Sequence, residues 1–152
     1  MKLTTKVGLF ALALTVGLSS TWLPAGAQAA QKAAPKRPRV FFIEPKNGAM
    51  VTSPVHLKFG VENYQLAPVP EGDPKTARPG LGHHHVGIDI GCLPPGTVIV
   101  KGTPSWVHFG DGKSEFDVQL PPGRHRLALQ FGDDLHKTLP RLCTTITLNV
   151  AK

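Results

Sequence analysis

Residues 55–62 read VHLKFGVE, in which apolar Val55, Leu57, Phe59 and Val61 alternate with His56, Lys58, Gly60 and Glu62. Successive side chains of a β-strand point to opposite faces, so this period of two is typical of a strand with one buried face. The same alternation recurs at 116–120 and at 125–131. These three stretches predict strands that contribute to one core.

Apolar stretches at 40–43, 83–90, 97–101 and 142–150 complete a predicted set of seven strands. Turn sequences separate them, among them Gly110-Asp111-Gly112 and Pro121-Pro122-Gly123, and four prolines exclude a helix from the long loop 65–82. Short strands with turns every 8–12 residues or so are the signature of an all-β fold, here an immunoglobulin-like antiparallel β-sandwich of about seven strands. A small barrel is the competing architecture.

Residues 1–29 have the layout of a secretory signal peptide. A short basic stretch ending at Lys6 precedes an apolar run at 7–18, and small residues alternate from Ala25 to Ala29. This run is too short to span a bilayer, which takes about 20 apolar residues. We therefore expect a periplasmic or secreted protein with no stable membrane anchor. Residues 30–39 form a predicted basic, Pro/Ala-rich flexible arm, and 40–152 a single β-sandwich domain.

The positive charge of the chain lies mostly outside this predicted domain. The full sequence carries a formal net charge of +7, but residues 40–152 hold 11 Lys and Arg against 10 Asp and Glu. A nucleic-acid-binding domain carries its basic patch on the folded surface. The charge distribution and the export signal therefore argue against nucleic acid as a partner.

Cys92 and Cys143 are the two cysteines of the chain. Export favours a disulfide between them, which would close a loop of about 50 residues and typically contribute about 2–4 kcal/mol. The predicted strands place the two cysteines toward opposite ends of the sandwich, whereas a disulfide needs Cα atoms within about 7 Å. The predicted bond therefore requires the segment 91–97 to fold back.

The most unusual feature of the sequence is the run His83-His84-His85 at the start of a predicted strand. Alternation puts His83, His85 and Asp89 on one face and His84 on the other. Residues i and i+2 on a strand lie about 6.5 Å apart, so His83 and His85 can both reach one ion.

Further ligands are expected from loops that the predicted topology brings to the same place. In a seven-strand sandwich of this type, the connections after the second, fourth and sixth strands lie at one end. This end gathers the histidine run with His108, Asp133, Asp134 and His136, whereas His125 falls at the far end and His56 faces solvent. The predicted metal ligands are His83, His85, His108 and His136.

Imidazole in its neutral form binds Cu(II), Zn(II), Ni(II) and Fe(II). For an exported protein with nitrogen donors we rank copper first and zinc second. We expect Asp89 and Asp133 to orient ligand rings as hydrogen-bond acceptors. The alternatives to a metal are a structural hydrogen-bond network and a rim that gains charge between about pH 5 and pH 7.

Several short motifs recur in a fixed order along the chain: Gly82-His83-His84-His85 with Ile88-Asp89, His108-Phe109-Gly110 with Gly112 and Glu115, Leu120-Pro121-Pro122-Gly123 with His125, and Gly132-Asp133 with His136. This combination resembles an exported bacterial family, domain of unknown function 4399, over about residues 40–150. The resemblance implies a secreted small β-sandwich without an established reaction. It also implies that His84 and His125 belong to the histidine pattern, so both are added as alternate ligands or supporting residues. The cysteines are not part of the family pattern.

These observations favour a metal carrier or sensor with a histidine-rich rim, and not an enzyme. The chain has no G-x-S-x-G elbow, and Ser53, Ser105 and Ser114 lack a recognisable catalytic partner. The competing hypothesis is an interaction module that binds an envelope protein, with histidines that are structural or pH-responsive.

Overall fold

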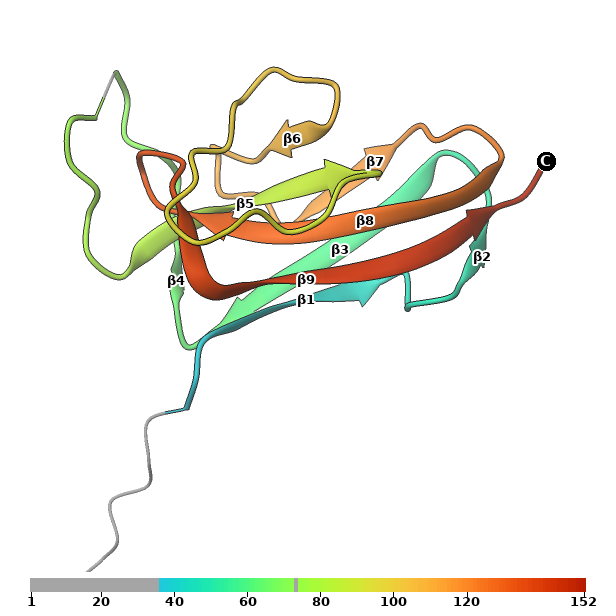
Figure 1. The fold of residues 1–152 in the computed structure, drawn as a ribbon, viewed down its shortest axis with the longest axis horizontal. Coiled ribbons are helices and arrows are strands. Elements are labelled where there is room, and N and C mark those ends of the chain that lie inside the picture. Colours follow the sequence, from blue (N-terminus) through green and yellow to red (C-terminus); the bar gives the residue numbers. More distant parts are fainter. Residues whose placement is uncertain (1–35, 73) are drawn as a thin grey trace, which may run out of the picture. The chain divides into compact units, whose positions relative to one another are not determined.

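The computed structural model describes residues 36–72 and 74–152, which form two packed sheets with no helix in these ranges (Figure 1). The smaller sheet has the order β1-β3-β7 and consists of β1 (Arg39–Glu44), β3 (Val55–Glu62) and β7 (Glu115–Val118). The larger sheet has the order β2-β9-β8-β5-β4, with β6 also paired to β5. Its strands are β2 (Met50–Val51), β9 (Thr138–Val150), β8 (Gly123–Gly132), β5 (Leu81–Ile88), β4 (Gln65–Leu66) and β6 (Trp106–His108).

The all-β sandwich expected from the alternating stretches is thereby confirmed. The predicted signal peptide at 1–29 and residues 30–35 of the predicted arm lie outside the described residues. Among the residues that the structure does describe, none form a helix with the length and hydropathy to cross a membrane. The strand number exceeds seven because the two-residue strands β2 and β4 add to the edges of the larger sheet.

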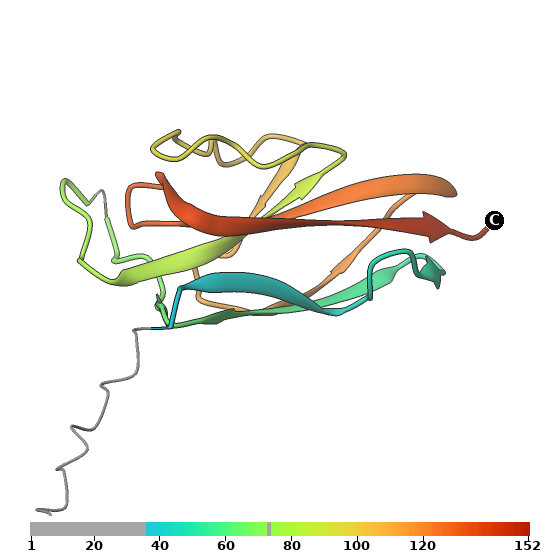
Figure 2. The ribbon, with the colours of Figure 1, turned by 60° about the horizontal axis from the view of Figure 1, so that its bottom comes forward.

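Alternate residues of facing strands build the main core. Leu57 and Phe59 of β3 are 0% and 1% exposed, and Leu127, Leu129 and Phe131 of β8 are fully buried. Figure 2 shows the two layers that these side chains join. The residues between these core positions point to the opposite face of each strand. The face of β5 and β8 that is turned away from the smaller sheet can therefore carry a different set of side chains.

The predicted strand at 97–101 is wrong. This stretch makes a single β-bridge, between Val98 and Lys137. The strand that pairs with β5 in this part of the chain is instead β6, which comes after residues 97–101 in the sequence. The alternation is real, since Ile99 is 1% exposed while Val98 and Val100 are 50% and 63% exposed. The alternation arises because Ile99 is buried against Trp106 and Ala128, in a second, smaller hydrophobic cluster, while its two neighbours face solvent.

The segment between β5 and β6 runs back across the outer face of the larger sheet (Figures 1 and 2). This course brings Cys92 to Cys143 of β9, where the two form a disulfide with a Cα–Cα distance of 6.0 Å. The predicted bond is confirmed, and the fold-back that it required is what the structure shows.

Asp89 and His125 join the end of β5 to the start of β8. Asp89, which has a positive φ of 54°, accepts hydrogen bonds from His125 Nδ1 at 2.9 Å and from the Arg126 amide at 3.0 Å. His125 Nε2 lies 2.9 Å from the Pro121 carbonyl. The expectation that Asp89 orients one of the four predicted ligand rings is wrong, because the ring that it contacts is that of His125, at the opposite end of β8 from His83.

Both nitrogens of His125 face acceptors, so the arrangement favours the doubly protonated ring. Burial alone would lower the pKa of His125, but the Asp89 carboxylate and the Pro121 carbonyl raise it above its usual value. A raised pKa in the folded state stabilises the protein at low pH, and this contribution is lost as the pH rises through that pKa.

We therefore expect Asp89→Asn to lower the free energy of unfolding by about 1 kcal/mol below about pH 6.5, and by less at pH 8.5. Asn tolerates a positive φ, so the turn itself is retained. Urea unfolding of the parent protein and of the Asp89→Asn variant, at one pH below about 6.5 and at pH 8.5, measures the loss of stability under each condition. An equal loss at both would show that protonation of His125 is not involved.

Candidate metal centre

Four imidazoles from three separate parts of the chain meet on the outer face of the larger sheet. His83 and His85 lie on β5, His108 ends β6, and His136 lies in the loop between β8 and β9. The ladder between β5 and β6 pairs His85 with His108. One nitrogen of each ring lies within 4.8 Å of one nitrogen of every other ring, so the structure brings together the four histidines that the sequence singled out as ligands.

The ring nitrogens face one another directly. His108 Nε2 lies 2.9 Å from His136 Nε2 and 3.1 Å from His83 Nε2, and the His85 ring centroid is 4.5 Å from that of His83. Four nitrogens at about 2.0–2.1 Å from one ion are about 3.3 Å apart in a tetrahedron, and neighbours in a square plane about 2.9 Å. These two separations are close to those of neighbouring ligands around a single ion, whereas the full set of four nitrogens lies within 4.8 Å.

Several nitrogens of the cluster have no hydrogen-bond partner in the protein. These are Nδ1 of His83 and both ring nitrogens of His85, on side chains that are 0% exposed. A buried polar group left unpaired costs about 1–3 kcal/mol. Moreover, His108 Nε2 faces two other nitrogens, although a neutral ring has one donor to share. Hydrogen bonding within the protein therefore does not account for the arrangement.

The environment keeps all four rings neutral near pH 7. Burial, and after it the neighbouring imidazoles, lower the pKa of His83 to about 3 and that of His85 to about 2. The pKa of His108 is lowered by burial, then by His136 and Lys101, and that of His136 by burial and then by Lys101. Neutral imidazole is the form that donates a lone pair to a metal.

Hydrogen bonds of the loop backbone place His136. The Asp133 carboxylate accepts bonds from the amides of Leu135 at 2.8 Å and Lys137 at 2.9 Å, and the His136 amide donates to the Asp133 carbonyl. This turn holds His136 at a φ of 61°. Asp133 thus shapes the loop, and the prediction that it accepts a hydrogen bond from a ligand ring is wrong.

An ion pair between buried Asp134 and the partly exposed Arg78, which sequence reasoning missed, anchors the same loop. The Asp134 side chain is 1% exposed and accepts hydrogen bonds from Arg78 Nε at 2.9 Å and Nη2 at 2.8 Å. The pKa of Asp134 is held below its usual value first by these bonds. Arg78 lies in the long loop between β4 and β5, and no local pattern indicates a contact between residues so far apart in sequence.

His84 is part of the core, not a ligand. Its ring lies edge-on to Phe59 and Phe131, with centroid distances of 4.9 and 5.0 Å. Neither ring nitrogen makes a hydrogen bond of standard geometry. Burial lowers the pKa of His84 to about 4, opposed weakly by the backbone of Gly60 and Lys113. With His125 bound to Asp89, both alternate ligands suggested by the family resemblance lie outside the cluster.

Two glycines make room for the rings of His85 and His108. A Cβ atom on Gly132 would lie 2.9 Å from Cε1 of His85, and one on Gly110 would overlap the ring of His108. Contacts under 3.0 Å are not found for real Cβ atoms, so a side chain at either position would displace an imidazole.

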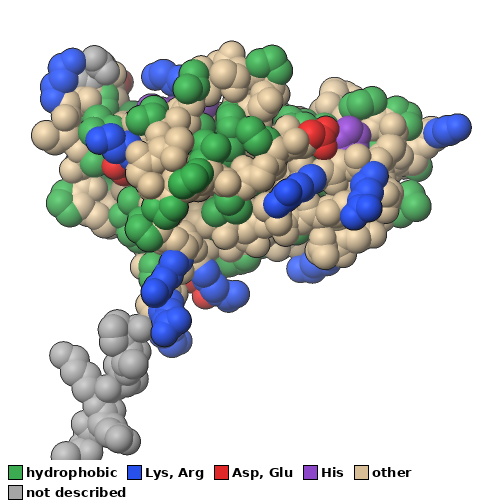
Figure 3. Space-filling model, viewed as in Figure 1, with side chains coloured by type: hydrophobic (Ala, Val, Ile, Leu, Met, Phe, Trp, Pro, Cys, Tyr) green, Lys and Arg blue, Asp and Glu red, His purple; other side chains and the backbone are tan. Residues whose placement is uncertain are grey.

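The cluster is more accessible on one side than on the other. His108 and His136 are half-buried, and a pocket of about 210 Å³ reaches His136, Lys101 and Asp134. Little histidine surface is visible on the face shown in Figure 3. These features place the approach to the cluster beside His136.

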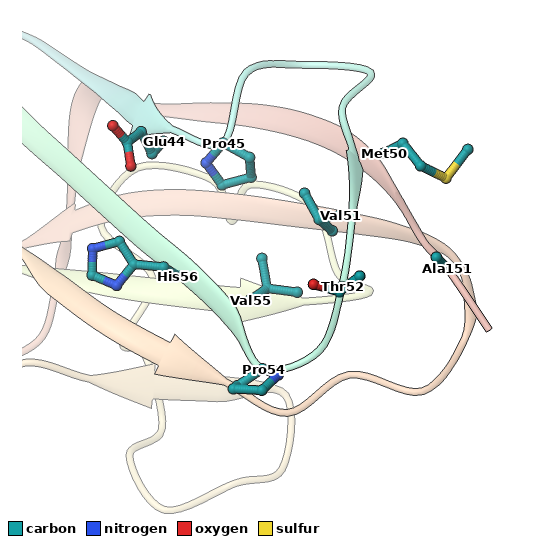
Figure 4. Close-up of a pocket in the computed structure, with 9 residues that line it drawn as sticks. All are labelled: Glu44, Pro45, Met50, Val51, Thr52, Pro54, Val55, His56 and Ala151. Atoms are coloured by element: carbon teal, nitrogen blue, oxygen red, sulfur yellow. The ribbon is translucent and has the colours of Figure 1, made fainter.

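A larger pocket, about 500 Å³, lies near β2 and the end of β9, whereas the cluster lies near the other end of β8. Figure 4 shows mostly apolar side chains around it. Its one imidazole is that of His56, whose Nδ1 lies 2.8 Å from Asp117. This pocket holds no convergent set of ligands, so the histidine cluster remains the candidate site.

Comparison with known proteins identifies a family but no activity. The family model described as "Domain of unknown function (DUF4399)" matches residues 57–151. No curated protein matches the chain. Among solved structures, the X-ray structure of the endo-β-1,4-mannanase from Thermotoga petrophila is similar, with 19% sequence identity and a TM-score of 0.47. The match covers 79% of this chain and 21% of that enzyme, so the chain spans about a fifth of its length.

The depressed histidine pKa values predict that the metal-free protein loses stability in acid. The unfolded chain takes up protons below about pH 6.5, whereas folded His83 and His85 do not until about pH 3 and pH 2. The free energy of unfolding should therefore fall by about 2–4 kcal/mol between pH 7 and pH 5.

Urea unfolding in the presence of a chelator measures this slope. The variant His85→Leu should show a shallower slope, because it removes one of the groups that protonate on unfolding. A free energy of unfolding that stays constant from pH 7 to pH 5 would contradict the prediction.

Proposed function

We propose that this chain, which belongs to the DUF4399 family, binds one transition-metal ion through His83, His85, His108 and His136. The observation that carries the proposal is the convergence of four neutral imidazoles, two buried and two half-buried. Three of their ring nitrogens, Nδ1 of His83 and both nitrogens of His85, have no hydrogen-bond partner. The same observation argues against a structural hydrogen-bond network, because such a network would pair those nitrogens.

The ligand chemistry favours copper first and zinc second. The cluster consists of imidazoles alone, and imidazole suits Cu(II), Zn(II) and Ni(II), whereas Mg²⁺ and Ca²⁺ prefer oxygen ligands. Nitrogen separations of 2.9 and 3.1 Å fall near those of neighbours in the square-planar arrangement that Cu(II) prefers. For either ion the more distant nitrogens of the set, which lie within 4.8 Å, would move closer together.

A site with four protein ligands favours storage or transport over catalysis. Catalytic zinc sites keep one position open for water or substrate, whereas sites with four protein ligands are closed. We therefore propose a carrier or sensor in the periplasm or outside the cell, in line with the predicted signal peptide at 1–29. Partly exposed His108 and His136 would give the ion a route in and out.

Titration of the purified protein with Cu(II) and Zn(II), in competition with a chelator, tests the proposal. We expect one ion to bind per chain. The electron paramagnetic resonance spectrum of bound Cu(II) should show hyperfine structure from nitrogen ligands. The variants His108→Ala and His136→Ala should weaken binding by more than about 100-fold, which is beyond the effect of losing a supporting residue.

His56→Ala is the matched control, since His56 is an exposed histidine paired with Asp117. It should bind metal as the parent protein does. If the parent protein binds neither ion at micromolar concentration, or if all three variants bind equally, the proposed function is wrong.

The glycines beside the rings give a second prediction. Gly132→Ala should weaken metal binding at least tenfold and destabilise the fold by about 1–3 kcal/mol, because its methyl group displaces the His85 ring. Gly91→Ala is the control, since a Cβ atom there would lie 3.4 Å from Arg126, an ordinary contact. Equal metal affinity in both variants would show that the position of His85 is unimportant.

A further inference from the structure

The disulfide and the histidine cluster share one row of residues across the larger sheet. Gln130 of β8 pairs with His85 on one side and with Cys143 on the other. The Gln130 side chain, 1% exposed, accepts a hydrogen bond from the Leu93 amide at 2.8 Å and donates one to the Leu93 carbonyl at 3.0 Å. Cys92, next to Leu93, forms the disulfide with Cys143. Residues 92 and 93, at the start of the segment that crosses the outer face of the larger sheet, are therefore held by the disulfide and by the hydrogen bonds to Gln130. Gln130 is the residue that pairs with His85.

The same segment continues to the loop that holds His136. Thr138 Oγ1 donates to the Pro94 carbonyl at 2.6 Å, and the Thr138 amide donates to the Thr97 carbonyl at 2.9 Å. The Ile99 amide then donates to the carbonyl of His136 at 2.9 Å. This bond adds to the turn formed by Asp133, which holds the left-handed backbone of His136. The segment 92–99 thus connects the disulfide mechanically to one metal ligand.

We propose that the Cys92–Cys143 disulfide controls the metal site, such that its reduction releases the segment 92–99, frees His136 and lowers the affinity for the ion. This inference rests on the proposed function and assigns a means of regulation to that same site. The bond is accessible to a reductant, since Cys92 is exposed while Cys143 is half-buried.

Reduction need not unfold the sandwich. The main core lies between the two sheets and is built from other residues, among them Leu57, Phe59 and Leu129. The outer segment contributes only to the small cluster around Ile99 and Trp106, against which Leu93 and Cys143 pack. Loss of the disulfide therefore acts on the segment 92–99 and its hydrogen bonds to Thr138 and His136 more than on the fold that carries β5.

The reductant is a dithiol, either a small molecule or an exported thiol–disulfide exchange protein. Its thiolate attacks Sγ of Cys92, forming a mixed disulfide and releasing Cys143 as a thiolate, which takes up a proton. The second thiol of the donor then displaces Cys92. Two electrons and two protons pass to the protein, which ends with two thiols, and the donor ends as a disulfide.

The test compares the Zn(II) affinity of the oxidised protein, the phosphine-reduced protein after removal of the phosphine, and the double variant Cys92→Ser/Cys143→Ser. Zn(II) is the probe because it has no redox chemistry of its own. We expect both forms without the bond to bind Zn(II) at least tenfold more weakly. Amide hydrogen exchange at Ile99 and Thr138 should accelerate at least tenfold, with Leu129 in the core unchanged.

The double variant separates loss of the bond from metal capture by the new thiols, because it has none. Phosphine treatment of this variant should change nothing. Equal Zn(II) affinity in the oxidised and bond-free forms, or unchanged exchange at Ile99, would overturn the redox control while leaving the metal site in place. If the oxidised protein binds neither Zn(II) nor Cu(II), the proposed function itself fails, which is a distinct result.

Discussion

Side-chain alternation along β5 is the constraint on which the rest of the structure depends. His84 points into the core while His83 and His85 point outward, and pairing of His85 with Gln130 and His108 fixes this register. A slip of one residue would exchange the two faces. Two imidazoles would then enter the core, one would lie outside, and the cluster would no longer exist. The fold and the candidate site therefore depend on the same register.

The cluster is assembled at a cost in stability. Its unpaired nitrogens and its neutral, buried rings are unfavourable in the metal-free protein. The sandwich offsets that cost through the core on the opposite face of β5 and β8, where Leu127, Leu129 and Phe131 are fully buried. Because the strands hold the rings before an ion arrives, binding would order few further groups. Such preorganisation raises affinity.

Periodicity was sufficient to predict the sandwich and the faces of its strands, because alternation of apolar residues directly reflects which face is buried. The assumed sandwich topology also brought His83, His85, His108 and His136 to one place, because it puts the connections after the second, fourth and sixth strands at one end. Periodicity and topology failed for 97–101, for Asp89 and for the Arg78–Asp134 pair. These positions lie in irregular segments, whose course depends on contacts with residues distant in sequence, and such contacts leave no local pattern.

The division between regular and irregular segments also separates two properties of the site. His83, His85 and His108 lie on paired strands, where the backbone allows little movement, so they would set the geometry and hence the choice of metal. His136 lies on a loop held by hydrogen bonds to the segment 94–99 and borders the pocket of about 210 Å³. Movement of this single ligand would open the site without disturbing the sheet. An ion would therefore be selected by the strands and released by the loop.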